Sequence, residues 1–142
     1  MQPEEVTWLV AERLNAGDTA GMAALYEPEA VLAYPADQPV TGREAIQAIC
    51  QQMADAGAAF AVGTPLPTVR FEDLALTSTR SADNTGVRVQ VPRRQPDGSW
   101  LRIMDRPEVP QPSRSRYAAA LRPRGQRVPA RGKPRCRKAS RA

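Results

Sequence analysis

The sequence predicts an α+β domain in which helices precede an antiparallel sheet. As far as residue 57, apolar residues recur at helical spacing, whereas from Ala59 onward they alternate with polar residues as in strands. Turn clusters at 83–86 and 96–99 separate the alternating segments, and Asp-Gly between two strands favours a hairpin. Helices followed by a run of strands are typical of the α+β class.

Two helices are predicted at the start of the chain. Pro3 is favoured at the opening position of a helix, and the acidic residues after it suit the positive end of the helix dipole. The apolar stripe of this helix consists of Val6, Leu9, Val10 and Leu14. Asp18 is expected to cap a second helix over 19–26, which Pro28 would break.

A short strand is expected over 30–34, followed by a third helix. Thr41 and Glu44 have the spacing of a capping box, in which the Thr41 hydroxyl accepts from the backbone of Glu44 and Glu44 reaches back. Gly57 is expected to end this helix. Its apolar face consists of Ile46, Ile49, Cys50 and Met53.

Four strands are predicted in the second half of the domain. They cover 59–63, 68–79, 86–94 and 99–106. Two prolines fall between the first two, so that boundary stays open. In the last strand, simple alternation places Asp105 on the same face as Leu101 and Ile103, with Arg102 on the opposite face.

The chain divides by charge into a domain at 1–108 and a tail at 109–142. The domain carries fifteen acidic and nine basic residues, a net charge of −6, whereas the tail carries eleven basic residues and no acid. The tail is rich in Arg and Pro and lacks apolar periodicity, so we predict that it is disordered. Three interpretations stay open: a solvated extension, a segment that binds nucleic acid non-specifically, and a frame-shifted reading of GC-rich DNA.

Composition excludes several classes of function. The 142 residues contain no histidine, which rules out Ser-His-Asp catalysis, Cys-His catalysis and His-ligated metals. The scattered carboxylates indicate no metal, and we expect no cofactor. Two cysteines, Cys50 and Cys136, cannot form a disulfide framework, and Cys50 in an apolar stripe should behave as a small hydrophobe. With an acidic N-terminus and no apolar span, we expect a cytoplasmic protein without a membrane segment.

Several motifs, taken in order, resemble the nuclear transport factor 2-like superfamily, which includes SnoaL-like polyketide cyclases and ketosteroid isomerases. They lie at 14–18, 24–31, 42–46, 74–80, 93–100 and 103–107. The later ones look like uncharacterised bacterial members. The resemblance covers about residues 3–108. It implies a cone-shaped domain, in which a curved sheet wraps a long helix and leaves a pocket for a hydrophobic small molecule. It also implies a homodimer through the outer face of the sheet.

The resemblance does not carry over the residues of steroid isomerisation. The isomerase's oxyanion-binding tyrosine falls at Val10, its general-base aspartate at Tyr34, and the aspartic acid that completes the oxyanion hole near Val91. A valine cannot donate a hydrogen bond to an oxyanion, and a neutral tyrosine is a poor base at neutral pH. Isomerisation by that mechanism is therefore not expected.

Six residues are candidates for a functional site. Asp105 is the candidate acid/base, because an inward carboxyl would be desolvated; the alternative is an edge carboxylate paired with Arg102, Arg106 or Arg88. Tyr34 is a second catalytic candidate, which would donate its hydroxyl to a ligand. The candidates for substrate binding are Arg13, Val10, Trp8 and Tyr26.

Each of these candidates has a structural alternative. Arg13 can bind an anionic or carbonyl ligand, or can snorkel or form a salt bridge at the edge of its helix. Tyr34 and Tyr26 can line an aromatic pocket or simply pack in the core. Trp8, opposite the apolar stripe, and Trp100 on the last strand can mark contact surfaces instead.

Three functions follow from these alternatives. The first is a small-molecule pocket protein, either a cofactor-free isomerase, cyclase or hydrolase acting on a hydrophobic carbonyl substrate or a binder of such a compound. The second is a non-catalytic ligand-binding or dimerisation module. The third is non-specific association with nucleic acid through the basic tail.

Overall fold

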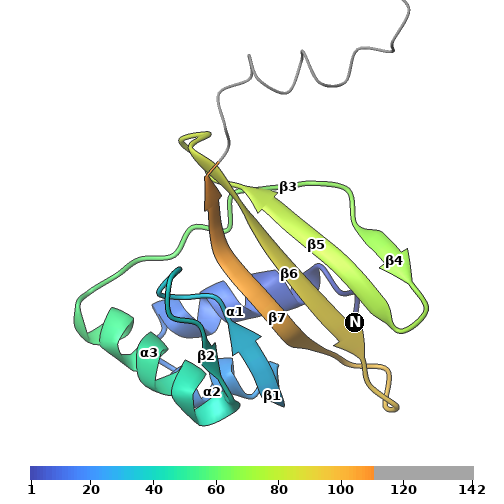
Figure 1. Cartoon of the computed structure of the whole chain (residues 1–142), viewed down its shortest axis with the longest axis horizontal. Helices are drawn as coiled ribbons and strands as arrows, with labels where there is room; N and C mark the ends of the chain where they lie inside the picture. Colours follow the sequence, from blue (N-terminus) through green and yellow to red (C-terminus); the bar gives the residue numbers. More distant parts are fainter. Residues whose placement is uncertain (111–142) are drawn as a thin grey trace, which may run out of the picture. The chain divides into compact units, whose positions relative to one another are not determined.

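Residues 1–110, the part of the chain that the structure describes, form three helices and seven strands (Figure 1). The structure is a computed structural model. The tail predicted at 109–142 lies outside the described residues except for the last two positions of the final strand. The elements are α1 (Glu5–Asn15), α2 (Thr19–Ala23), β1 (Tyr26–Leu32), β2 (Val40–Thr41), α3 (Arg43–Asp55), β3 (Thr64–Pro65), β4 (Val69–Phe71), β5 (Leu74–Arg80), β6 (Gly86–Arg94) and β7 (Trp100–Pro110).

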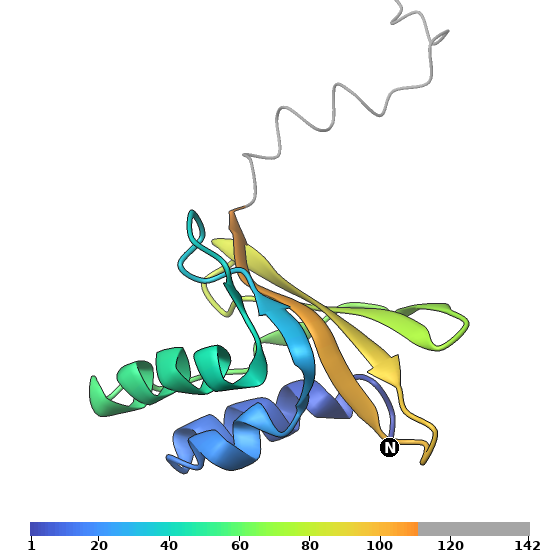
Figure 2. The same cartoon turned by 60° about the horizontal axis from the view of Figure 1, so that its bottom comes forward.

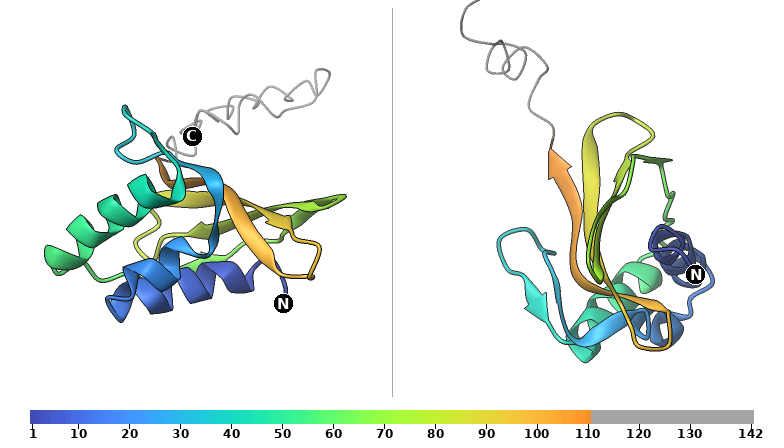
Figure 3. Two further views of the ribbon diagram at one scale, coloured as in Figure 1. Left: turned by 90° about the horizontal axis from the view of Figure 1, so that it is seen from below. Right: turned by 90° about the vertical axis from the view of Figure 1, so that its right-hand side faces the viewer.

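The strands form one curved sheet, and α1 and α3 lie on the same side of it (Figures 2 and 3). The strand order is β2-β1-β7-β6-β5-β3, with β4 paired to β5. β1 runs parallel to β7, and the other pairs are antiparallel. This confirms the predicted α+β class with a curved sheet against N-terminal helices. None of the helices in residues 1–110 is long and apolar enough to cross a membrane.

The first two helices follow the predicted pattern at their buried faces. Val6, Val10 and Leu14 of α1 are buried, and Leu9 is half-buried. The Asp18 carboxylate caps α2 as predicted, because its Oδ1 accepts a hydrogen bond from the backbone N–H of Gly21 at 2.8 Å. The helical periodicity therefore identified which face of α1 packs into the core.

The boundary between α2 and β1 differs from the prediction. The helix expected to run to residue 26 ends at Ala23, and the strand expected at 30–34 already begins at Tyr26. Pro28 lies inside this strand instead of breaking a helix. It is tolerated there because the register with β7 shifts between Tyr26 and Val31, and an irregular ladder does not require every backbone N–H.

The capping box predicted for α3 is wrong. Thr41 pairs with Val31 as a residue of β2, so the chain is still extended at the position where the box would need Thr41 as a cap. Gly42 is the N-cap instead, without a side-chain hydrogen bond, and its φ of 96° suits glycine. The rest of the prediction is confirmed: Ile46 is buried on the apolar face, and Gly57 follows the end of the helix with a φ of 74°.

The later strands are partly as predicted. Residues 59–63 form no strand, and the segment 68–79 is two strands joined by a turn at Glu72, whose φ is 53°. β6 has the predicted bounds of 86–94, whereas β7 extends past the predicted end at residue 106. Trp100 is only 5 % exposed and packs in the core, so it does not form the contact surface suggested for it.

A β-bulge in β7 overturns the predicted alternation of its side chains. Val91 pairs with Met104 but Pro92 pairs with Arg102, so β7 holds one extra residue, Ile103, at this point. The extra residue shifts the alternation by one position. Arg102 and Asp105 therefore lie together on the concave face, although strict alternation placed them on opposite faces.

We expect Thr41→Ala to change the free energy of unfolding by less than about 0.5 kcal/mol, as most surface substitutions do. Loss of a working capping box would cost about 1 kcal/mol. Urea-induced unfolding measures the difference. Asp18→Ala is the matched control, because the Asp18 carboxylate does cap a helix, and it should be the more destabilising change. The opposite ranking would contradict Gly42 as the N-cap of α3.

Candidate functional site

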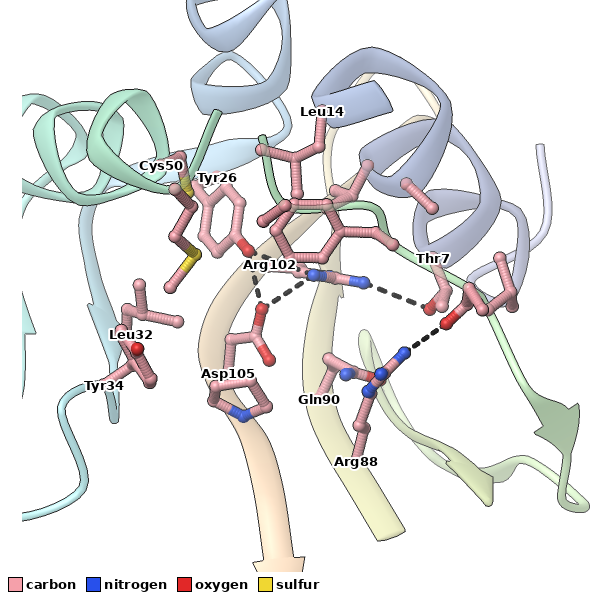
Figure 4. Close-up of a pocket in the computed structure, with 18 residues that line it drawn as sticks. Thr7, Leu14, Tyr26, Leu32, Tyr34, Cys50, Arg88, Gln90, Arg102 and Asp105 are labelled. Carbon is pink, nitrogen blue, oxygen red and sulfur yellow. Dashed lines mark hydrogen bonds and ion pairs between the residues drawn. The ribbon is translucent and has the colours of Figure 1, made fainter. Parts of the chain in front are cut away.

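A cavity of about 300 Å³ lies between the helices and the concave face of the sheet (Figure 4). Ligand pockets in proteins begin at about this size. α1, α3 and the segment 58–62 contribute apolar side chains such as Val10, Leu14 and Phe60, whereas β1, β6 and β7 contribute most of the polar ones. The cavity is therefore apolar over most of its wall and polar on the side of the sheet.

Four buried side chains form a hydrogen-bonded network on the polar side. Asp105 Oδ2 accepts a hydrogen bond from the Tyr26 hydroxyl at 2.6 Å and from Arg102 Nη1 at 2.7 Å. Arg102 Nη1 lies 3.0 Å from the Tyr26 hydroxyl oxygen, and Arg102 Nη2 donates to the Thr7 hydroxyl at 3.2 Å. The side chains of Arg102 and Asp105 are 4 % and 5 % exposed. The network therefore joins β1, β7 and α1 inside the domain.

One oxygen of Asp105 has no partner. All the hydrogen bonds to this carboxylate end on Oδ2, and Oδ1 is buried without a donor among the described residues. Figure 4 shows the second carboxylate oxygen turned away from Tyr26 and Arg102. Gln90, which also lines the cavity, pairs directly with Asp105 across β6 and β7. The site thus offers a free carboxylate oxygen with an amide side chain beside it.

The surroundings of the site determine which of its groups carry charge. Burial raises the pKa of Tyr26 well above its ordinary value, and the neighbouring Asp105 carboxylate adds to the effect, so Tyr26 stays a neutral donor. Burial alone would lower the pKa of Arg102, but the neighbouring Asp105 and Tyr26 together outweigh burial, so the net shift is upward. Burial raises the pKa of Cys50 to about 11. Cys50 is therefore a thiol at neutral pH and a poor nucleophile.

The structure brings four of the six candidate residues to the cavity. Asp105, Tyr26, Val10 and Tyr34 all line it. Tyr26 and Asp105 are in direct contact, whereas Tyr34 is 40 % exposed and lies at the surface. Asp105 also has one of the partners weighed for it, since it pairs with Arg102.

The other two candidates lie elsewhere. Arg13 does not line the cavity, because its Nη1 forms a salt bridge with Asp18 Oδ2 at 2.7 Å on the surface. This pairing is the structural alternative considered for Arg13. Trp8 is 52 % exposed and does not line the cavity either. Neither side chain is placed to bind a ligand in this cavity.

Sequence reasoning missed Arg102, Gln90, Arg88 and Thr7 as lining residues. A polar side chain in the middle of an apolar strand is the signal that could have identified Gln90. Arg102 gave no usable signal, because strict alternation turned it away from Asp105. Within residues 1–110, no three acidic or thiol side chains converge as a metal site.

One wall of the cavity is an irregular segment fastened by side chains. The side-chain amide of Asn15 forms two hydrogen bonds with the backbone of Phe60. Its Nδ2 donates to the Phe60 carbonyl and its Oδ1 accepts from the Phe60 N–H, each at 2.9 Å. Arg88 Nη1 donates to the Ala61 carbonyl (Figure 4). The segment lies between Gly57 and Gly63, both of which have a positive φ. Residues 58–62 therefore depend on side chains, not on a strand ladder, for their position.

We expect Arg102→Met to lower the free energy of unfolding by about 3–5 kcal/mol, because it leaves the Asp105 carboxylate buried without its cation. Tyr26→Phe removes one hydrogen bond but keeps the ring, so it should cost only about 1–2 kcal/mol. Urea-induced unfolding measures both. The double variant Arg102→Met with Asp105→Leu should recover part of the loss. A loss below about 1 kcal/mol in Arg102→Met would contradict the buried ion pair.

The fold is shared with several solved structures. A domain of unknown function with a cystatin-like fold from Nostoc punctiforme has a TM-score of 0.64 at 16 % identity, over 82 % of this chain and 80 % of that one. A nuclear transport factor 2-like protein from Novosphingobium aromaticivorans has a TM-score of 0.57 at 18 % identity, with 84 % and 86 % covered. A ketosteroid isomerase-like protein from Erwinia carotovora has a TM-score of 0.56 at 15 % identity, with 73 % and 90 % covered. At such identities the likeness shows the fold alone.

The sequence itself assigns the family. The search of curated proteins gave no match. The family profile of the SnoaL-like domain matches residues 8–132, most of the chain and past the domain end predicted at residue 108. This match confirms the resemblance drawn from the motifs, and the solved structures agree with it. The chain belongs to the SnoaL-like domain family.

Proposed function

We propose that this protein binds a hydrophobic carbonyl compound in its cavity and that Asp105 acts on this compound as an acid–base group without a cofactor. One observation carries the proposal: Asp105 Oδ1 is buried and unpartnered at the polar side of an otherwise apolar cavity. Apolar walls bind the body of such a compound, and a few polar groups orient it. SnoaL-like family membership supports a small-molecule ligand.

The contacts of Asp105 suit proton transfer. Tyr26 and Arg102 hold Oδ2, so the carboxylate cannot rotate and Oδ1 keeps one direction. Oδ1 can then take a proton from a carbon next to the carbonyl or from a water molecule, which covers isomerase, cyclase and hydrolase chemistry. The amide of Gln90, opposite Asp105 in the sheet, can donate to the carbonyl oxygen. Arg102 and Tyr26 act as positioning residues.

A binder without turnover is the second candidate. The donors of Arg102 Nη1 and Tyr26 are both directed at Asp105, so neither is free to stabilise an oxyanion. Val10 and Tyr34, which occupy positions of the isomerase's catalytic groups, also provide no oxyanion donor and no strong base. On this alternative, Asp105 Oδ1 accepts a hydrogen bond from a ligand hydroxyl and nothing is transformed.

We expect the wild-type protein to exchange the α-protons of a hydrophobic ketone such as β-tetralone for deuterium in heavy water, as followed by NMR. Asp105→Asn should slow the exchange by about 100-fold or more, the usual contribution of a general base. Slower alkylation of Cys50, which lines the cavity, reports whether the ketone is bound. A Cys136→Ser background leaves Cys50 as the only thiol.

The two readouts separate the candidates. Protection of Cys50 without deuterium exchange would favour the binder and contradict the acid–base role of Asp105. Neither protection nor exchange across a panel of hydrophobic ketones and alcohols would contradict the proposed ligand class. Circular dichroism on Asp105→Asn shows whether this variant is still folded.

We also propose that the protein forms a homodimer through the outer face of the sheet. Apolar residues lie side by side on neighbouring strands there, since Val69 pairs with Leu76, and Met104 pairs with both Val91 and Val31. Val69, Leu76 and Met104 are 62 %, 42 % and 51 % exposed. Such a row of exposed apolar side chains favours burial against a second protein surface.

We expect Met104→Lys to convert the dimer into a monomer, because dimerisation would bury the lysine charge in an apolar interface without a carboxylate partner, which is energetically costly. Light scattering coupled to size-exclusion chromatography measures the mass. Trp8→Lys is the control, because Trp8 is equally exposed but lies on α1. Dimer loss in the control alone would place the interface on the helices, and a monomeric wild type would contradict the dimer.

Association of nucleic acid with the tail is a separate proposal. It is supported by the eleven basic residues of 109–142, which lie outside the described residues apart from the end of β7. Such binding would be non-specific and would weaken strongly with added salt. Deletion of this segment should abolish it.

A further inference from the structure

The charged side chains around the cavity do not balance. Of the described residues that line it, Arg88, Arg102 and Asp105 carry charge. Arg102 and Asp105 form an ion pair and neutralise each other. Tyr26 and Cys50 have raised pKa values and stay neutral. One positive charge, on Arg88, is therefore left over in the wall of a mostly apolar cavity.

Arg88 lies beside the proposed catalytic groups. It is two residues from Gln90 on β6, and both side chains line the cavity. Figure 4 shows Arg88 next to Gln90, on the opposite side of the cavity from Tyr34. Within residues 1–107, whose side chains the structure describes, no carboxylate forms a salt bridge with Arg88. Its one hydrogen bond among the described residues uses Nη1, so its remaining N–H groups are free for a ligand.

We propose that Arg88 binds the anionic group of an amphipathic ligand, so that the compound taken up by the cavity is a hydrophobic carboxylate. This inference rests on the proposed function and deepens it by naming the ligand class. A guanidinium recognises a carboxylate through paired hydrogen bonds, and the low-dielectric wall of the cavity strengthens the attraction. Arg88 is then the residue that makes the site prefer an anion.

The charges also determine the orientation of the bound ligand in the cavity. Asp105 is already paired with Arg102, so this ion pair presents no net charge to a carboxylate, whereas Arg88 attracts it. The carboxylate of the ligand therefore lies at Arg88 and its carbonyl or hydroxyl group lies at Asp105 and Gln90. The apolar body between them contacts residues such as Val10 and Phe60.

A purely structural role for Arg88 makes different predictions. Arg88 also holds the cavity wall by donating to the Ala61 carbonyl. Arg88→Gln keeps an N–H donor for this carbonyl but removes the charge, whereas Arg88→Lys keeps the charge. Arg106→Gln is the control, because Arg106 is exposed on the next strand and does not line the cavity.

The test uses two fluorescent probes with the same aromatic body, the anion anilinonaphthalene sulfonate and the neutral N-phenylnaphthylamine. We expect the wild type to bind the sulfonate more tightly. Arg88→Gln should lower the affinity for the sulfonate by about tenfold or more, which corresponds to loss of a charged hydrogen bond. The affinity for the neutral probe should stay almost unchanged. Arg88→Lys should keep most of the preference, and Arg106→Gln should keep all of it. Protection of Cys50 from alkylation verifies that each probe occupies the cavity.

Several results would overturn the inference. If Arg88→Gln lowers the affinity for both probes equally, Arg88 only holds the cavity wall in place. If Arg106→Gln lowers the affinity for the sulfonate and Arg88→Gln does not, the anion binds outside the cavity. If the neutral probe binds as tightly as the sulfonate, the anion preference fails while the proposed cavity ligand stands. If neither probe protects Cys50, the proposed function fails as well.

Discussion

Arg102 and Asp105 form an ion pair inside the protein, where two charges removed from water must satisfy each other. They do so with the help of Tyr26, whose hydroxyl donates to the same carboxylate oxygen, and of Thr7, which accepts from the guanidinium. Burying two charges is costly, and only good geometry repays it. The β-bulge at Ile103 provides that geometry, because it turns Arg102 and Asp105 to the same face of β7. The rest of the site depends on this arrangement.

The ion pair also determines what the cavity can do. By engaging Oδ2, Arg102 and Tyr26 leave Oδ1 as an oriented acceptor, and by neutralising each other Arg102 and Asp105 leave Arg88 as the unbalanced charge. The cavity thus combines an apolar wall, one acceptor and one cation. Its remaining side, residues 58–62, is fastened by Asn15 and Arg88 and not by a strand ladder. The polar groups on the sheet are therefore held rigidly by their hydrogen bonds, whereas the wall at 58–62 is held only by side chains.

Much of the fold could be predicted from local sequence. The apolar stripe of α1, the Asp18 cap, the buried face of α3 and the bounds of β6 all depend on residues close together in the chain, and all are confirmed. The errors lie where distant segments pair. Thr41 is extended because β2 pairs with Val31, and Tyr26 is in a strand because β1 lies beside β7. Tertiary pairing overrides local preference at such positions.

The candidate site likewise depends partly on local sequence and partly on the pairing of distant segments. From the sequence alone came the α+β class, the family resemblance, the absence of histidine chemistry and the selection of Asp105 and Tyr26. Only the tertiary structure decided that these two residues touch, that Arg102 joins them, that Arg13 pairs with Asp18 at the surface, and that Arg88 faces the cavity. The physical reason is that residue type and spacing set local periodicity, whereas a bulge and a charge partner are set by segments far apart in the chain.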